Sequence, residues 1–125
     1  MSGIAVFTEG AAWSRRLAPN DIQEQDMLRH IVFFSVAAEE NREKVQKGLE
    51  LLKTNPHKRH LEVGRVDKKL DAISEQVDFV VYGEFDDAEQ LAAYKAHPIY
   101  QESIDLVRPL REMRVAADYV VPEAE

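Results

Sequence analysis

Cysteine is missing from this sequence of 125 residues, and its absence excludes several kinds of site. Without a thiol, the chain can form no disulfide and can offer no thiolate nucleophile, no iron–sulfur ligand and no cysteine ligand for zinc. Long apolar runs are missing too, because stretches such as Ile31-Val32-Phe33-Phe34 are far shorter than the roughly 18 residues that span a membrane. We therefore expect no membrane partner, and a cytoplasmic location suits such a chain.

Positive charge is also in short supply. The 16 lysine and arginine residues are outnumbered by 23 aspartates and glutamates, which gives a net charge of −7. The field of such a protein repels phosphate backbones, so nucleic acid is not an expected partner. Hydrophobic residues make up 45% and charged residues 31% of the chain, as in an ordinary globular protein and unlike a disordered or fibrous one.

The length of the chain predicts a single domain. Residues 1–26 show no regular hydrophobic period, and we interpret them as an N-terminal extension. Their Arg15-Arg16 pair lacks the apolar stretch that an export signal requires after it. Regular patterning begins at residue 27, so the domain is expected at residues 27–121, followed by a short tail at residues 122–125.

Hydrophobic periodicity within the domain predicts four strands and two helical segments. The second helical segment is expected to begin at Asp86 as its N-cap, with Glu89 three residues later, and to break at His97-Pro98. The expected elements are a strand at 28–36, a helix at 39–53, strands at 61–66 and 77–85, a helix after 86 that restarts at 98 and ends near 109, and a strand at 111–121. This order predicts an α+β, ferredoxin-like βαββαβ fold, a four-stranded antiparallel sheet with its helices on one face.

The strands are apolar on both faces, which is unusual for an antiparallel sheet with one wet side. The first strand places His30, Val32 and Phe34 on one side and Ile31 and Phe33 on the other. Two helices can cover only one face of the sheet, and an uncovered apolar patch of this size marks an interaction surface. The simplest cover is a second copy related by a two-fold axis. We therefore predict a homodimer that packs sheet to sheet.

Five segments along the chain form a recognisable pattern. They are Met27-Leu28-Arg29-His30-Ile31-Val32-Phe33-Phe34, Gly83-Glu84-Phe85-Asp86-Asp87, Ala93-Tyr94-Lys95-Ala96-His97-Pro98, Val107-Arg108-Pro109-Leu110 and the strand end Asp118-Tyr119. Together they resemble the stress-responsive α/β-barrel (Dabb) domain family. The resemblance spans about residues 27–121 and implies a dimeric α/β barrel, in which the sheets of two subunits close a barrel and each subunit has a small cleft between sheet and helices.

Resemblance to the family's plant polyketide-cyclase members implies candidate catalytic residues. The strand histidine and the tyrosine that line the cleft in those members correspond to His30 and Tyr94, whereas Tyr100 and Phe79 stand where they have further histidines. An imidazole titrates near neutral pH and a phenol can donate to a developing oxyanion. His30, Tyr94 and His97 are therefore the candidate acid–base residues.

Each of these residues also has a purely structural interpretation. His97 can satisfy backbone groups at the helix break, Tyr94 can belong to the core, and His30 can simply be hydrogen-bonded. A void of roughly 300 Å³ or more beside them favours ligand binding, and a filled core favours the structural interpretation. The residues expected to contact a ligand in the cleft are Val32, Phe34, Phe79, Val81 and Tyr100.

We predict a homodimer that binds a small apolar or aromatic ligand, with no established catalysis and no cofactor. The alternative is a cofactor-independent enzyme that performs cyclase-like or isomerase-like proton transfer on a small aromatic or polyketide-like compound. Heme degradation or monooxygenation is a third and weaker interpretation, because the single tryptophan, Trp13, lies outside the family-like region. No metal site is expected, since the His57-x-x-His60 pair has no third ligand nearby in the sequence.

Overall fold

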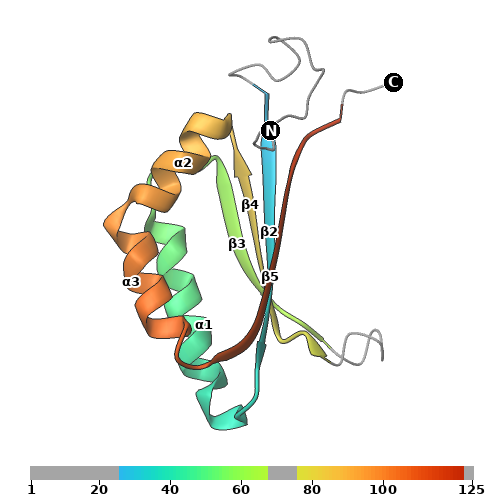
Figure 1. Ribbon diagram of the computed structural model, residues 1–125, viewed down its shortest axis with the longest axis vertical. Coiled ribbons are helices and arrows are strands. Elements are labelled where there is room, and N and C mark those ends of the chain that lie inside the picture. Colours follow the sequence, from blue (N-terminus) through green and yellow to red (C-terminus); the bar gives the residue numbers. More distant parts are fainter. Residues whose placement is uncertain (1–25, 68–75, 123–125) are drawn as a thin grey trace.

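In the described part of the chain, four antiparallel strands form one sheet, and the helices lie together on one of its faces (Figure 1). The structure is a computed structural model that describes residues 26–67 and 76–122. The elements are β2 (Leu28–Val36), η1 (Glu39–Asn41), α1 (Arg42–Glu50), η2 (Leu51–Thr54), β3 (His60–Arg65), β4 (Phe79–Phe85), α2 (Ala88–Ala96), α3 (Pro98–Val107) and β5 (Arg111–Val120). The predicted ferredoxin-like βαββαβ fold is confirmed. Apart from Asp26 and Pro122, the predicted extension, with Trp13, and the predicted tail lie outside the described residues.

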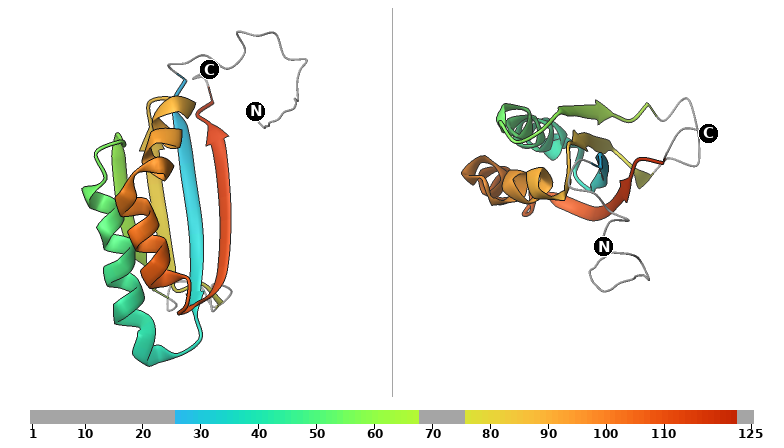
Figure 2. Two further views of the ribbon diagram at one scale, coloured as in Figure 1. Left: turned by 60° about the vertical axis from the view of Figure 1, so that its left-hand side comes forward. Right: turned by 90° about the horizontal axis from the view of Figure 1, so that it is seen from above.

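The strands are ordered β3-β4-β2-β5, so the first and last strands of the domain are neighbours. In this register His30 lies opposite Gly83 on β4 and opposite Asp118 on β5. Residues directly opposite in an antiparallel pair share a face. Asp118 is therefore brought to the helix-covered face beside His30, although the two are far apart in the chain. Figure 2 shows the helices together on one side of the sheet, with β5 at its edge.

Several predicted boundaries differ from the structure by one or two residues, among them the start of α2 and the start of β4. Helix α2 has Asp87 as its N-cap, not Asp86: the Asp87 backbone is extended and its carboxylate accepts from the Gln90 backbone N–H at 2.7 Å. Both aspartates have a suitable residue three positions later, so the sequence does not separate them. Strand β4 begins at Phe79 rather than at 77. The buried Asp78 carboxylate accepts from the Val36 N–H (2.7 Å) and pairs with Arg42 (2.8 Å), while the Asp78 backbone still bonds to Phe34 and Val66.

The predicted break between α2 and α3 occurs at His97-Pro98. His97 has the extended backbone that a residue before proline adopts, with φ −70° and ψ 141°. Its Nδ1 accepts from the Ile99 backbone N–H at 3.1 Å, which caps the first turn of α3. The position of His97 in the fold is thus explained by local backbone chemistry.

The core lies between the sheet and the helices. Helices α1 and α3 approach closely at Gly48, where a Cβ atom would lie 2.8 Å from Val107 Cγ2. The Ser103 hydroxyl reinforces this contact by donating to the Gly48 carbonyl at 2.8 Å. Among the described residues, none of the helices is long and apolar enough to cross a bilayer. The buried apolar residues are Val32, Phe34, Val36, Val45, Leu49, Leu52, Leu61, Phe79, Val81, Phe85, Leu91, Tyr94 and Val107.

The opposite face of the sheet is also apolar, as the two-faced strands predicted. Phe33 on β2 lies opposite Val115 on β5, and their exposed fractions are 37% and 52%. The next pair on this face is Ile31 with Ala117, and Tyr119 lies near its end with 41% exposure. No helix of the described part of the chain covers this face, which we call the outer sheet face (Figure 2).

Candidate functional site

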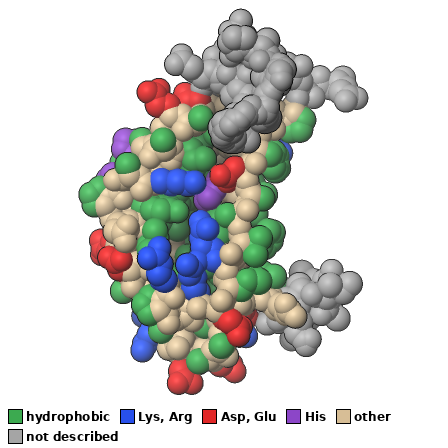
Figure 3. Space-filling model, viewed as in Figure 1, with side chains coloured by type: hydrophobic (Ala, Val, Ile, Leu, Met, Phe, Trp, Pro, Cys, Tyr) green, Lys and Arg blue, Asp and Glu red, His purple; other side chains and the backbone are tan. Residues whose placement is uncertain are grey.

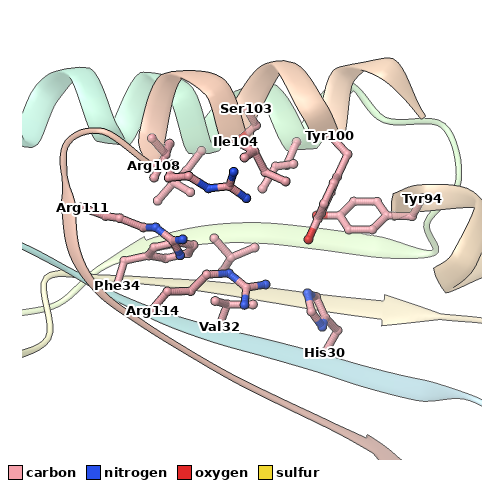
Figure 4. Close-up of a pocket in the computed structure, with 14 residues that line it drawn as sticks. His30, Val32, Phe34, Tyr94, Tyr100, Ser103, Ile104, Arg108, Arg111 and Arg114 are labelled. Atoms are coloured by element: carbon pink, nitrogen blue, oxygen red, sulfur yellow. The ribbon is translucent and has the colours of Figure 1, made fainter. Parts of the chain in front are cut away.

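A cavity of about 260 Å³ lies between the sheet and helix α3 (Figure 4). Its apolar floor is formed by residues of the helix-covered sheet face and its roof by α3. The volume is slightly below the roughly 300 Å³ at which we expect ligand binding to be favoured, but the space is a cavity and not a filled core. The apolar lining residues are Val32, Phe34, Leu49, Leu52, Val81, Ile104 and Val107, and the polar ones are His30, Tyr94, Tyr100, Ser103, Arg108, Arg111 and Arg114.

At one end of the cavity the lining residue His30 pairs with Asp118, a carboxylate that is not itself part of the cavity wall. His30 is only 2% exposed, and its Nδ1 donates to the Asp118 carboxylate across the β2–β5 ladder. Burial raises the pKa of Asp118, but the hydrogen bond from His30 and the nearby charges of His30, Lys95 and Arg114 outweigh it and lower the pKa overall. A neutral imidazole that donates through Nδ1 has Nε2 as a proton acceptor. The pair can therefore accept a proton from a molecule in the cavity.

Two tyrosines lie beside His30. The Tyr94 ring centroid is 6.3 Å from that of His30 and 5.3 Å from that of Tyr100, and both contacts are edge-on. Burial, with a smaller effect of Tyr100, raises the pKa of Tyr94 far above its ordinary value. The Tyr94 phenol is thus a proton donor and not a base near neutral pH. Figure 4 shows Tyr100 descending from α3 towards the His30 end of the cavity.

Three arginines that were not predicted as site residues also line the polar wall, together with Ser103. Arg108 follows α3, whereas Arg111 and Arg114 belong to β5. Burial and the charges of Arg114 and Arg108 lower the pKa of Arg111, as expected for clustered like charges. A sequence signal was available, because three arginines within seven residues are unusual in a chain with a net charge of −7.

The structure brings most of the predicted site residues together, but not all of them. Phe79 and His97 are absent from the cavity wall. Phe79 is fully buried beneath the Arg65 guanidinium, and the His97 ring lies against His57 at 5.8 Å. The roles that the sequence suggests for these two residues stay predictions. The predicted site residues that do line the cavity are His30, Val32, Phe34, Val81, Tyr94 and Tyr100.

The His57-x-x-His60 pair does not act as one cluster. His60 Nε2 pairs with the Glu62 carboxylate at 2.6 Å, on the exposed strand β3, whereas His57 lies beside His97. Within residues 26–67 and 76–122, no three side chains of the types that hold metal ions are grouped closely enough to do so.

Replacing Asp118 by asparagine should weaken the acid sensitivity of folding. A carboxyl group whose pKa is lowered by folding stabilises the protein above its unfolded pKa, near 4, and this contribution is lost as the pH falls through the folded pKa. We expect the wild type to lose stability below about pH 4, and Asp118→Asn to be less stable at neutral pH but to lose less on acidification. Urea unfolding followed by circular dichroism measures both.

The control for this experiment is Asp105→Asn on α3, an exposed aspartate distant from His30 in the sequence. It should follow the wild-type pH dependence. Equal acid sensitivity in the Asp118 variant and the wild type would show that the His30–Asp118 pair adds no pH-dependent stability.

Comparisons with known proteins agree with the observed fold. A dimeric protein of unknown function and ferredoxin-like fold from Bacteroides fragilis is 22% identical, with a TM-score of 0.65 over 80% of this chain and 99% of that chain. A Dabb family protein of ferredoxin-like fold from Mesorhizobium loti is 27% identical, with a TM-score of 0.62 over 79% and 100% of the chains. A mutant of SnoaB, a cofactor-independent oxygenase from Streptomyces nogalater, is 15% identical, with a TM-score of 0.58 over 79% and 96%. No curated protein matches the sequence.

The family model of the Stress responsive A/B Barrel Domain matches residues 28–121. The match runs from the first residue of β2 to the residue after β5, so it includes every described strand and helix. It confirms the resemblance that the His30 strand and the Tyr94–Pro98 segment indicated. The chain belongs to the stress responsive A/B barrel domain (Dabb) family.

Proposed function

We propose that the protein is a homodimer in which each subunit binds one small, partly apolar molecule in the cavity beneath α3. The observation that carries this proposal is the cavity itself, about 260 Å³ with an apolar floor and a polar wall. Such a combination is typical of small-molecule sites, in which apolar surface provides affinity and a few polar groups fix orientation. Figure 3 shows the surface hollowed at this place, with apolar groups inside and basic groups around it. The volume suits a molecule of one or two rings.

The homodimer in this proposal uses the outer sheet face. Three large apolar side chains, Phe33, Val115 and Tyr119, are between 37% and 52% exposed there. Similar structures, including the one from Bacteroides fragilis, are described as dimeric. A two-fold axis would place the same apolar patch of each subunit against its copy. A cytoplasmic location and the absence of nucleic-acid and membrane partners stay predictions from composition.

Replacing Ile104 by tryptophan should fill the cavity and abolish binding. Ile104 is a partly exposed wall residue of α3, so a larger side chain at this position can enter the cavity without displacing the buried core. We use 2-naphthol as a neutral two-ring probe and isothermal titration calorimetry as the measurement. The wild type should bind the probe, and Ile104→Trp should bind it at least about tenfold more weakly, because the probe would lose most of its apolar contact.

The matched control is Leu106→Trp, which places the same large ring on α3 outside the cavity, at a residue that is 50% exposed. This variant should bind 2-naphthol as the wild type does. Binding that persists in Ile104→Trp would locate the probe elsewhere on the protein. Failure of the wild type to bind 2-naphthol or its carboxylate analogue 2-naphthoate would contradict the proposal of a small-molecule site.

The histidine–carboxylate pair favours a second candidate, a cofactor-independent enzyme that transfers a proton. His30 would remove a proton from a small aromatic or polyketide-like compound through Nε2, and Asp118 would stabilise the resulting imidazolium. Tyr94, whose raised pKa keeps it protonated, or Tyr100 beside it would donate to the developing oxyanion. The similarity to the Streptomyces oxygenase supports the fold only, because its identity is 15%.

A further inference from the structure

We propose that the ligand of the cavity is a carboxylate with a small apolar body, and that Arg108, Arg111 and Arg114 hold its negative charge. The inference rests on the proposed function, since it concerns the same cavity. It goes further by assigning a chemical class to the ligand and a binding role to three arginines that are not among the site residues predicted from the sequence.

The three guanidinium groups lie around one cavity. Figure 4 shows Arg108 reaching into the cavity from the α3 side and Arg111 and Arg114 from the sheet side. Space-filling Figure 3 shows basic groups gathered around the same hollow, over its apolar interior. The charges therefore surround one part of a single cavity and are not spread along a surface. A ligand held there would meet charge at one end and apolar side chains at the other.

The three guanidinium groups form no ion pair within the described residues. Among the described residues, no carboxylate forms an ion pair with Arg108, Arg111 or Arg114, and none of the three side chains donates a hydrogen bond to the protein. Other arginines of the chain do have such partners: Arg42 pairs with Asp78 at 2.8 Å, and Arg59 with Asp86 at 3.2 Å. Asp118 lies near enough for the Arg114 charge to lower its pKa, but its carboxylate is paired with His30 and with none of the three guanidinium groups. The three like charges repel one another, and an anion placed among them would reduce this repulsion.

The anion that suits these arginines and the apolar floor is a carboxylate. Guanidinium groups are planar and match the two oxygens of a carboxylate with paired hydrogen bonds. The apolar floor beside them includes Val32, Phe34 and Val81, which suits a hydrocarbon or aromatic body. A polyanion is disfavoured, because the chain carries a net charge of −7 and the cavity is small. The arrangement therefore fits a single small molecule with one charged end.

The orientation of the ligand follows from the two ends of the cavity. With its carboxylate among the arginines, the apolar body would extend along Val32 towards the His30 and Tyr100 end. The histidine–carboxylate pair would then face the part of the ligand that is farthest from its charge. The same placement would serve a bound ligand and a substrate, so it does not depend on which of the two candidate functions holds.

The test compares two probes that share one ring system, neutral 2-naphthol and anionic 2-naphthoate. We expect the wild type to bind 2-naphthoate at least about tenfold more tightly, as charge-assisted hydrogen bonds from arginine imply. The double variant Arg108→Gln/Arg114→Gln changes two exposed side chains and should keep the fold. It should lose most of the preference for the carboxylate and bind 2-naphthol within about twofold of the wild type, because the apolar contacts are unchanged. Calorimetry gives all four affinities.

The control variant is Lys44→Gln/Lys47→Gln, which removes two positive charges from exposed positions of α1 outside the cavity. It should keep the wild-type preference, which separates local contact from net charge. Equal affinity of the wild type for the two probes, or a preference that survives in the arginine double variant, overturns this inference while the proposed binding function stands. If neither probe binds the wild type, the proposed function fails and this inference fails with it.

Discussion

Replacing Val115 by glutamate is expected to convert the protein from a dimer to a monomer and to raise the dimer Kd by at least about 100-fold, or about 2.7 kcal/mol. Val115 is 52% exposed on the outer sheet face, directly opposite Phe33 on the neighbouring strand. A two-fold axis through this face would bury two introduced carboxylates at once, one from each subunit. Desolvating a carboxylate without a partner costs several kcal/mol, so even partial burial reaches the expected effect.

Size-exclusion chromatography with light scattering over a range of concentrations measures this change. The control is Leu106→Glu, which places the same charge at an apolar residue of α3 that is 50% exposed on the helix side of the molecule. This variant should remain a dimer. A monomeric wild type at micromolar concentration would contradict the homodimer, and a dimeric Val115→Glu variant would show that the outer sheet face is not the interface.

Most of the fold follows from the spacing of apolar residues. Alternation along β2 and β4 predicts two apolar faces, and the structure shows one face against the helices and the other exposed. The boundary of β4 could not be predicted, because it depends on a contact across the fold. The Asp78 carboxylate binds the Val36 N–H and Arg42, while its backbone still bonds to Phe34 and Val66, and nothing in the sequence near Asp78 indicates these partners.

The sequence predicts those features of the candidate site that are set within a single strand or helix. The patterning of β2 places His30 on an apolar face, and the structure confirms this position. The partner of His30 was not predictable, because Asp118 is brought to it only by the β2–β5 register. The spacing of the arginines is a signal in the sequence, but it does not indicate where their side chains point. Arg108 follows α3 and Arg114 belongs to β5, and the turn between these elements directs both to one cavity.

Replacing Phe79 by alanine is expected to lower the free energy of unfolding by about 4 kcal/mol, the usual cost of removing a fully buried aromatic ring. Phe79 has no exposed surface, and the Arg65 guanidinium lies 5.9 Å from the centre of its ring. The neighbouring strands are held by their hydrogen bonds, so they cannot close the space that the ring would leave. Chemical denaturation followed by circular dichroism measures the loss, with Leu106→Ala at an exposed position of α3 as the control.

The sequence predicts a ligand contact for both Phe34 and Phe79, and this experiment tests whether Phe79 is instead a core residue. The two residues lie directly opposite each other in the β2–β4 register and share one face of the sheet, so the alternation of apolar residues assigns both to the cleft. Only Phe34 lines the cavity, while Phe79 belongs to the closed core. A loss of about 4 kcal/mol is expected for a core residue. A loss below about 1 kcal/mol, comparable with the exposed control, would show that the Phe79 site is not closed. The ligand contact predicted for Phe79 from the sequence would then be the better interpretation.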